Sequence, residues 1–181
     1  MINNDDLINK VKSYNKFFNP IILSKAYNFA LEAHKNQKRD AGEPYIIHPV
    51  AVADILTELK LDSATITTGL LHDTIEDTKV TYDSVKKEFG QEVADLVEGV
   101  TKISALEDKA SESSKAENFR KLILATSKDI RVLLVKIADR LHNMRTIKAI
   151  TKEDKRKRIA QETMEIYAPL ADRMGMHRIR D

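Results

Sequence analysis

The sequence predicts an all-α protein, and three observations lead to this prediction. The 181 residues include only five Gly and four Pro, the residues that interrupt helices most strongly. Apolar residues make up 42% and charged residues 32%, a mixture typical of amphipathic helices. The apolar residues recur at intervals of three and four, as on one helix face. Because the length suits a single core, we expect residues 1–181 to form one helical domain.

The first predicted helix begins at Asn19-Pro20, where a capping side chain precedes a proline that fits the first helical turn. Apolar residues then recur at helical spacing up to about Lys38. The stretch 39–45 interrupts this period with Gly and Pro, and we expect it to be a loop. Pro49 is predicted to restart a helix that extends to about residue 59.

Three further helices are predicted before residue 104. Asp62 is expected to cap the first of them, with Asp73 on the same side as the apolar residues 66 and 70. Residues 81–89 are predicted to form a short helix that Gly90 ends. Apolar residues between 93 and 100 continue the helical period in the next helix.

The stretch 104–115 reads SALEDKASESSK and is polar and rich in Ser. We expect a mobile loop here, because polar clusters without helical periodicity are typical of loops. The helical patterns on both sides fit one core, so the stretch is not predicted to link two domains.

Residues 130–147 are predicted to form a helix that is buried on most sides, since apolar residues lie all around it. Against that background Lys136, Asp139 and Asn143 fall on one face. A charged pair on a mostly buried helix needs a partner such as a metal ion or a phosphate. A last helix is expected from about Glu153, with a kink at Pro169.

The composition argues against several classes of protein. With no Cys, disulfides and thiolate metal sites are excluded, and a cytoplasmic location is expected. No apolar run reaches the length of a membrane span, and the polar N-terminus does not resemble a secretory signal. A net charge of +2 is too balanced to indicate nucleic acid as the partner.

The string LLHDTIEDT holds His72, Asp73, Glu76 and Asp77 within six residues. One hypothesis assigns His72 and Asp73 to a metal ion, with Glu76 and Asp77 facing the same cleft. The alternative is an acidic helix end in solvent. The helix dipole disfavours carboxylates at a C-terminus, which favours the metal hypothesis.

Two more residues could complete a metal site, although each has a simpler explanation. His48 could be a cap or a partly buried histidine, and Asp139 could pair with Arg140 or Lys136. Together with His72 and Asp73 they offer hard and borderline ligands that suit Mn²⁺, Fe²⁺, Mg²⁺ or Zn²⁺. Of the remaining histidines, His34 and His177 are predicted at the surface, and His142 lies off the face of Lys136, Asp139 and Asn143.

A histidine, a distant His-Asp pair and a later aspartate form a pattern that resembles the HD-domain metallophosphohydrolases. The strings RDAGEPYIIHP, LLHDTIEDT, FGQEVADLVEGVTKI and IKIADRLHNMRT are more closely similar to the hydrolase domain of RelA/SpoT-type alarmone enzymes. This resemblance covers roughly residues 26–180, nearly the whole chain, and implies an HD-type helical bundle.

The resemblance implies hydrolysis of guanosine tetra- or pentaphosphate, a small-molecule substrate, to GDP or GTP and pyrophosphate. It implies one Mn²⁺ ion held by His48, His72, Asp73 and Asp139, and an acidic pair, Glu76 and Asp77, needed for hydrolysis. It further implies that Arg39 packs on the guanine base, that Tyr45 belongs to the same loop, and that Asn143 and Thr146 line the nucleoside pocket.

Some alternatives stay open on the sequence. Lys136 is either a phosphate-binding residue or a lysine that extends along the surface to solvent. By itself Arg39 is equally compatible with an ordinary loop arginine, and its loop reads Arg39-Asp40-Ala41-Gly42 where Arg-Lys-Ser-Gly is commoner. An acid beside the base pocket is expected to weaken affinity or alter preference.

Two other functions compete with alarmone hydrolysis: hydrolysis of another 3′-phosphorylated nucleotide, and alarmone binding without turnover. Residues 168–181 resemble the connector to a synthetase domain, and no synthetase motif is present. We therefore expect either a naturally short hydrolase or a piece of a longer enzyme, with no obligate protein partner.

Overall fold

The computed structural model describes residues 2–110, 119, 123–124 and 128–176, and these residues confirm the all-α prediction. Within them the backbone is helical apart from loops and one isolated bridge between Lys38 and Pro44. The elements in chain order are α1 (Asn4–Tyr14), α2 (Pro20–Ala33), α3 (Ile47–Glu58), α4 (Ser63–Leu71), α5 (Thr74–Asp77), α6 (Tyr82–Phe89), α7 (Gln91–Ala110), α9 (Ile130–Arg145), a 3₁₀ turn (Ile147–Ala149), α10 (Glu153–Glu162), a π-helical turn (Thr163–Tyr167) and α11 (Ala168–Arg173).

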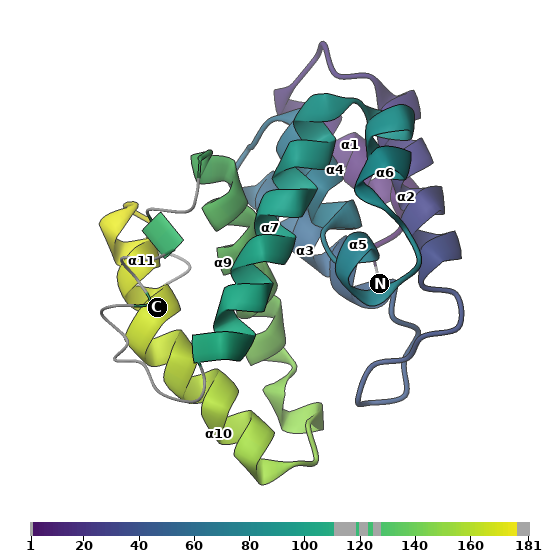
Figure 1. The fold of residues 1–181 in the computed structure, drawn as a ribbon. Helices are drawn as coiled ribbons and strands as arrows, with labels where there is room; N and C mark the ends of the chain where they lie inside the picture. The colour runs from purple at the N-terminus through teal and green to yellow at the C-terminus, as the bar shows by residue number, and fades with distance from the viewer. Residues whose placement is uncertain (1, 111–118, 120–122, 125–127, 177–181) are drawn as a thin grey trace.

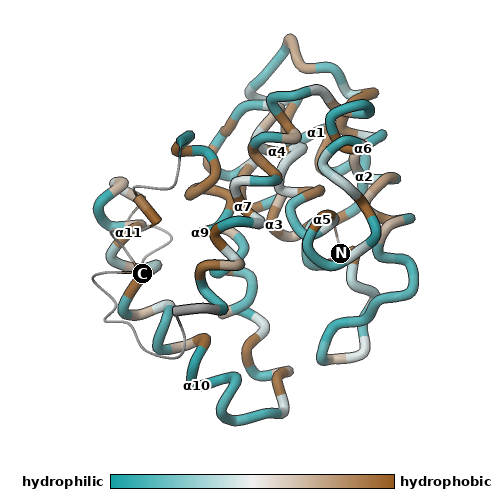
Figure 2. The backbone as a smooth tube through the Cα atoms, viewed as in Figure 1, coloured by the Kyte–Doolittle hydropathy of each residue, from teal (hydrophilic) through white to brown (hydrophobic). Residues whose placement is uncertain are grey.

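Helix α4 lies at the centre of the fold, and residues 65–71 within it are all buried. It packs against α2, α3, α7 and α9, while α6 packs on α7 and α1 packs on α2 and α3. Figure 1 shows α10 and α11 on the opposite side of α7 and α9 from α1 and α2. Helix α10 is mostly hydrophilic in Figure 2, and no residue in it is buried. The core therefore sits around α3, α4, α7 and α9.

Two glycines allow helices in this core to approach closely. A Cβ atom at Gly69 in α4 would lie 2.7 Å from Leu56 Cδ1 in α3, and one at Gly99 in α7 would lie 2.8 Å from Val132 Cγ2 in α9. Both separations are shorter than carbon atoms tolerate without displacement. The close α3–α4 contact matters because each of these helices delivers a histidine to the same place.

Several predicted helix boundaries are correct and others are wrong. Asn19 caps α2 by accepting a hydrogen bond from the Ile21 amide, as expected, but α2 ends at Ala33 rather than near Lys38. Helix α3 begins at Ile47, two residues before Pro49. Helix α4 stops at Leu71, so Asp73 begins α5 instead of sharing a face of α4. Helix α1 was not predicted, although Asn3 and Asp6 form a capping box at its start.

The predicted loop over 104–115 is wrong for residues 104–110, which continue α7; residues 111–115 lie outside the described part of the chain. The tertiary contacts explain the helix, since Ser104 and Glu107 point from α7 toward α9 and are bonded there to basic side chains. The bonds to these basic side chains stabilise residues 104–110 as a helix, although the polar composition of this stretch does not itself favour one.

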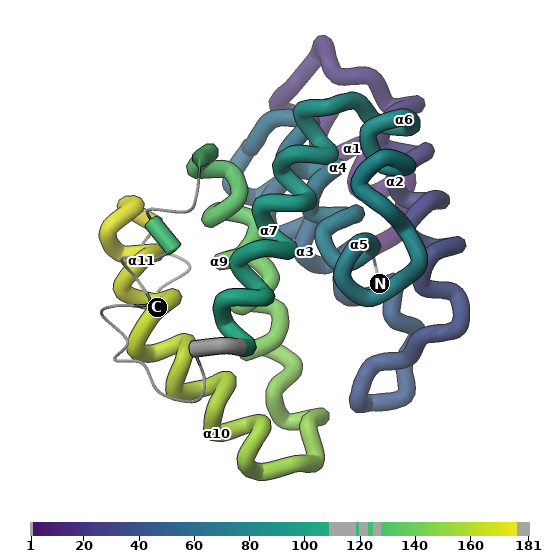
Figure 3. Tube along the Cα trace, viewed as in Figure 1, coloured from purple at the N-terminus to yellow at the C-terminus, as the bar shows by residue number. Residues whose placement is uncertain are grey.

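The C-terminal half follows the expected pattern. Helix α9 covers almost the predicted range and α10 starts at Glu153. A π-helical turn, Thr163–Tyr167, precedes Pro169 where a kink was expected, because a proline cannot supply the amide that continues an α-helix. Figure 3 shows the course of the chain from α9 through α10 to α11 as a tube. In the described residues, none of the helices is long and apolar enough to cross a membrane.

Candidate active site

Three segments of the chain bring the four predicted metal ligands together. His48 lies in the first turn of α3, and Asp139 lies in the second half of α9. His72 and Asp73 occupy the break between α4 and α5, where the chain turns before a new helix begins. All four side chains are buried, with His48 2% and His72 1% exposed.

The ligand atoms of these residues face one another. His48 Nε2 lies 2.9 Å from Asp139 Oδ1 and 3.5 Å from Asp73 Oδ2, and His72 Nε2 lies 3.1 Å from Asp73 Oδ2 and 3.6 Å from Asp139 Oδ1. One ligand atom each from His48, His72 and Asp139 falls within 4.8 Å of the others. This spacing is compatible with four ligands around one divalent cation.

The hydrogen bonding of His72 fits a metal ligand. Its Nδ1 lies 2.7 Å from the carbonyl oxygen of Gly69, an acceptor, so Nδ1 carries a proton and Nε2 is the atom left to face the carboxylates or a cation. That Nε2 atom is buried without a hydrogen-bond partner among the described residues. A buried nitrogen without a partner is costly unless something else occupies its lone pair, and a cation satisfies it.

Opposite charges hold the cluster in an ionised state. The Asp139 carboxylate is buried, but Lys136, His48 and His72 hold its pKa well below its ordinary value. Likewise the pKa of Asp73 is lowered because the attraction of His72 and His48 outweighs the effect of burial. The carboxylates in turn raise the pKa of His72 in spite of its burial. Two ionised carboxylates at this point supply the charge that a divalent cation needs.

Three of these residues, His48, Asp73 and Asp139, border a polar cavity of about 200 Å³, which Glu76 and Asp77 also line. Partial desolvation, followed by the negative charge of Asp73, raises the pKa of Glu76 to about 7. The same two causes raise the pKa of Asp77 above its ordinary value. The structure therefore places the predicted acidic pair beside the predicted ligands, and it gives Glu76 a pKa suited to proton transfer near neutral pH.

Tyr45, predicted to belong to the same loop as Arg39, lines the cavity of about 200 Å³. Its hydroxyl donates to Asp73 Oδ2 at 2.7 Å and to Asp77 Oδ2 at 3.3 Å. Burial and these carboxylates raise the pKa of Tyr45, so the phenol remains a neutral donor. Tyr45 thus ties a predicted metal ligand to the acidic pair.

Arg39 contacts the two residues predicted to share a nucleoside pocket with it. Its Nη2 donates to Thr146 Oγ1 at 2.9 Å and to Asn143 Oδ1 at 3.3 Å. A second cavity of about 240 Å³ begins here, bordered by the Arg39–Glu43 loop, Thr146 and the 3₁₀ turn. Asp40, the unusual acid of this loop, forms an exposed ion pair with Lys155 in α10. Asn143 also borders the metal cavity, so the two cavities are neighbours.

Lys136 is buried, which contradicts the alternative of a lysine that extends along the surface to solvent. Its Nζ lies 3.2 Å from Asp139 Oδ2, 2.7 Å from Glu107 Oε2 and 2.9 Å from Ser104 Oγ. Glu107 also pairs with Arg140, which extends the chain of charges toward α10. The sequence prediction missed Glu107 because it assigned this residue to a loop, although Val100, Ser104 and Glu107 have helical spacing.

Two histidines differ from their predicted roles. His34 was expected at the surface but is buried, with its Nδ1 2.6 Å from Gln37 Oε1; His177 lies outside the described residues. His142 was assigned no role, yet its Nδ1 lies 2.7 Å from Nδ1 of His48. Burial, with the nearby imidazole of His48 and guanidinium of Arg39, lowers the pKa of His142 to about 4. His142 lies three residues after Asp139 in α9, so the two side chains are neighbours on the helix surface. This spacing is the one sequence feature that could have indicated that His142 lies near the predicted metal ligands.

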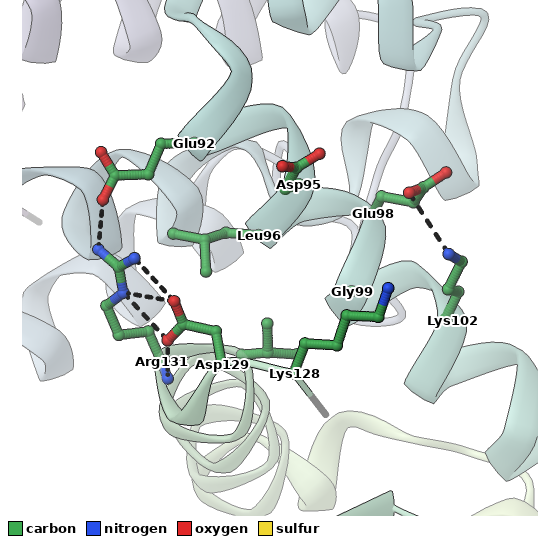
Figure 4. A pocket seen from close by; sticks show the side chains of 10 residues that line it. Glu92, Asp95, Leu96, Glu98, Gly99, Lys102, Lys128, Asp129 and Arg131 are labelled. Carbon is green, nitrogen blue, oxygen red and sulfur yellow. Dashed lines mark hydrogen bonds and ion pairs between the residues drawn. The ribbon is translucent and has the colours of Figure 1, made fainter. Parts of the chain in front are cut away.

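A larger cavity of about 480 Å³ lies between α7 and the start of α9 (Figure 4). Its acidic side chains already have cationic or hydroxyl partners: Arg131 binds Asp129 and Glu92, each at 2.7 Å. No histidine lines it, and the described residues form no metal-ligand group there. The larger cavity therefore lacks the features that mark the smaller one as a reaction site.

This fold and site define an all-α domain with a buried cluster of imidazoles and carboxylates that could hold a metal ion. The family model for the HD domain matches residues 26–177, and the chain belongs to the HD domain family. A solved structure described as a metazoan ortholog of SpoT that hydrolyzes ppGpp and plays a role in starvation responses aligns with a TM-score of 0.64 at 22% identity. The alignment covers 88% of this chain and 98% of that one, and at this identity it supports the fold alone.

Sequence relatives confirm the resemblance to RelA/SpoT-type proteins. The chain is 52% identical over 181 residues to the GTP pyrophosphokinase rsh of Brucella melitensis, covering 100% of this chain and 24% of that protein. It is 55% identical over 158 residues to the bifunctional (p)ppGpp synthase/hydrolase SpoT of Escherichia coli K12, covering 87% of this chain and 22% of that protein. A relative from Escherichia coli O157:H7 with the same identity and coverage is named guanosine-3′,5′-bis(diphosphate) 3′-pyrophosphohydrolase. The chain spans about a quarter of the length of these curated relatives.

Proposed function

We propose that this domain hydrolyses guanosine 3′,5′-bis(diphosphate), and the related pentaphosphate, to GDP or GTP and pyrophosphate, with Mn²⁺ as the metal. The observation that carries this proposal is the convergence of His48, His72, Asp73 and Asp139 beside a small polar cavity. The names of two relatives at 55% identity support the choice of substrate. A cytoplasmic location is part of the same proposal.

The metal proposal rests on the donor set of this chain. Two imidazoles and two carboxylates offer borderline and hard donors, and such donors suit Mn²⁺. Thiolates, in contrast, select softer metals. The cation would supply positive charge against the diphosphate and acidity to water at neutral pH. Nε2 of His72, which is buried next to the Asp73 and Asp139 carboxylates without a well-formed hydrogen bond, is the structural feature that such an ion fits most directly.

The two neighbouring cavities suggest how the substrate lies. The guanidinium of Arg39 is planar and weakly hydrated, so it can stack on guanine while it remains bonded to Thr146 and Asn143. The base and ribose would occupy the cavity of about 240 Å³ and the 3′-diphosphate the one of about 200 Å³. Lys136 adds positive charge to the second cavity, shared there with Asp139 and Glu107.

In the reaction, the oxygen of water forms a bond to the phosphorus that carries the ribose 3′ oxygen, and the bond from that phosphorus to O3′ breaks. The water loses one proton, and O3′ needs one as it leaves. Glu76 and Asp77 stand at the cavity mouth with raised pKa values, and we assign this proton transfer to one of the two. The hydroxyl of Tyr45, bonded to Asp73 and Asp77, keeps the acid and the ligand in a fixed relation.

The direct test is to incubate metal-free protein with ppGpp, with and without Mn²⁺, and to measure GDP and pyrophosphate. We expect both products in equal amounts and only when Mn²⁺ is present. Binding of ppGpp without product would favour a silent alarmone-binding module. Faster turnover of another 3′-phosphorylated nucleotide would instead assign the site to a different HD phosphohydrolase substrate.

A further inference from the structure

The two histidines of the proposed metal centre are held by different kinds of partner. Nδ1 of His72 faces the carbonyl oxygen of Gly69 at 2.7 Å, and a carbonyl can only accept. Nδ1 of His48 instead faces another imidazole nitrogen, Nδ1 of His142, at 2.7 Å. An imidazole nitrogen can either donate or accept, so this second arrangement depends on which nitrogen of His142 carries its proton.

We propose that His142 is a positioning residue of the metal centre, which accepts the Nδ1 proton of His48 and thereby presents the lone pair of His48 Nε2 to the cation. This inference rests on the proposed metal site and adds a residue that contacts neither the metal nor the substrate.

With a cation bound to Nε2 of His48, the geometry allows one assignment of protons. Nε2 of His48 faces Asp139 Oδ1 at 2.9 Å and Asp73 Oδ2 at 3.5 Å, which is the side on which a cation is bound. If Nε2 of His48 donates its lone pair to the cation, Nδ1 must hold the proton. Two nitrogens 2.7 Å apart share one proton, so Nδ1 of His142 is the acceptor and its own proton lies on Nε2.

The position of His142 in α9 makes it well suited to this role. It lies three residues after Asp139, so one helix supplies both a carboxylate ligand and the support for a histidine ligand. The two rings are tilted by 36° with centroids 4.9 Å apart, and both are buried. In addition, the backbone carbonyl of His142 accepts from Thr146 Oγ1 at 3.0 Å, and Thr146 is bonded to Arg39. His142 therefore links the support of the metal site to that of the nucleoside cavity.

Two substitutions of His142 distinguish the loss of the hydrogen-bond acceptor from the loss of side-chain volume. In His142→Asn the Oδ1 atom can occupy nearly the place of Nδ1 and accept the same proton, whereas His142→Leu removes the acceptor and keeps a similar volume. Mn²⁺ affinity is measured on the metal-free 181-residue protein by competition with a chelator. We expect about 10- to 100-fold weaker binding for His142→Leu and a change of less than about threefold for His142→Asn. Tyr14→Phe, which loses a hydrogen bond to the Leu61 carbonyl far from the site, is the matched control with unchanged affinity.

Turnover gives a second readout that a purely structural defect would not reproduce. If His142 acts through metal binding, the lost activity of His142→Leu should return with excess Mn²⁺. Wild-type affinity in His142→Leu, or equal weakening in the Asn and Leu variants, would overturn the proposal. Because metal affinity is measured without nucleotide, it tests His142 even if the proposed substrate is wrong.

A measurement on the unchanged protein avoids any folding defect of the variants. Zn²⁺-loaded protein with ¹⁵N-labelled histidines reports the protonated nitrogen of each ring by nuclear magnetic resonance. We expect the proton of His48 on Nδ1 and that of His142 on Nε2. A proton on Nδ1 of His142 would contradict the assignment.

Discussion

Two charged cavities lie against α9, and they differ in whether their charged side chains are paired with one another. The larger one, of about 480 Å³, is lined by acidic and basic side chains that pair with each other, such as Arg131 with Asp129 and Glu92. The smaller one, of about 200 Å³, is lined by the buried imidazole of His48 and the buried carboxylates of Asp73 and Asp139, with His72 beside them. The proposed reaction site is therefore the smaller of the two cavities, and it is distinguished by its buried imidazole and carboxylates and not by its volume.

The same contrast appears in the charges. In the larger cavity Asp129 has its pKa lowered by Arg131, so its charge is satisfied within the protein. In the smaller one the pKa of Glu76 is raised, since Asp73 and partial desolvation leave its charge unbalanced. A strained set of charges of this kind is typical of sites that bind ions or transfer protons. Matched substitutions in the two cavities test this difference.

The largest effect is expected from Asp139→Asn compared with Asp95→Asn. Asp139→Asn removes one ligand charge, so Mn²⁺ binding should fall below detection and turnover should be lost. Asp95 lines the larger cavity and accepts a hydrogen bond from the Tyr82 hydroxyl, and its substitution should leave both properties unchanged. Metal titration and pyrophosphate release measure the pair. Retained Mn²⁺ binding in Asp139→Asn would remove this residue from the ligand set.

The second comparison is Glu76→Gln with Glu98→Gln. Gln cannot exchange a proton, so turnover of Glu76→Gln should fall about 10²- to 10⁴-fold while Mn²⁺ remains bound. Glu98 is exposed and pairs with Lys102, so its variant serves as the control with full activity. A loss of metal together with activity would instead make Glu76 a ligand, and unchanged turnover would transfer the proton role to Asp77.

The third comparison is between one arginine from each region. Arg39→Ala should raise KM for ppGpp about tenfold, equivalent to about 1.4 kcal/mol, because it removes base contacts made before and during the reaction. Arg131→Ala breaks ion pairs with Asp62, Glu92 and Asp129, and should lower the free energy of unfolding by about 1 kcal/mol without changing KM. Steady-state kinetics and urea unfolding separate the two outcomes. An unchanged KM for Arg39→Ala would exclude it from the nucleoside pocket.

The fourth comparison uses the two close helix contacts. Gly69→Ala forces a Cβ against Leu56 between α3 and α4, and Gly99→Ala forces one against Val132 between α7 and α9. Each should cost about 1–3 kcal/mol of stability, partly offset by the better helix propensity of Ala. Gly69→Ala alone should also weaken Mn²⁺ binding a few-fold, since α3 and α4 carry His48 and His72. Equal metal affinity in both variants would show that the site tolerates a shift between its helices.

The sequence was most informative where local chemistry decides the structure. The cap at Asn19, the short helix that follows Thr81 and its stop at Gly90 were predicted from residue type and confirmed. The shared face of Lys136, Asp139 and Asn143 follows from helical spacing alone, and the structure joins all three by hydrogen bonds. The metal ligands were suggested by residue type and then by the family resemblance, and their roles remain proposals.

What the sequence could not supply is the identity of partners across the fold. Glu107 was assigned to a loop because its neighbours are polar, yet its contacts with Lys136 and Arg140 place it in a helix. His34 and His142 were assigned to the surface or to no role, because helical period does not reveal which side chain a neighbouring helix brings near. Such contacts depend on how α3, α7 and α9 cross, which no local pattern encodes.

The smallest expected effect is a proton released when Mn²⁺ binds. In the metal-free protein the charge of Asp73 helps to raise the pKa of Glu76 to about 7, so Glu76 is roughly half protonated at pH 7. A cation beside Asp73 offsets that charge and lowers the pKa of Glu76 toward its ordinary value, and the proton leaves. The wild-type protein should therefore release roughly half a proton more per Mn²⁺ than Glu76→Gln at pH 7.

Calorimetry of Mn²⁺ binding in buffers of different ionisation enthalpy measures this difference. It should disappear above about pH 9, where Glu76 is already ionised before the metal binds, and Glu98→Gln should behave like the wild type. Equal proton release from wild type and Glu76→Gln would show that the charge of Asp73 does not reach Glu76. In that case the raised pKa of Glu76 would come from desolvation and from the charge of Asp77. The smaller cavity would then differ from the larger one in its buried imidazole and carboxylates, but not in the effect of those carboxylates on Glu76.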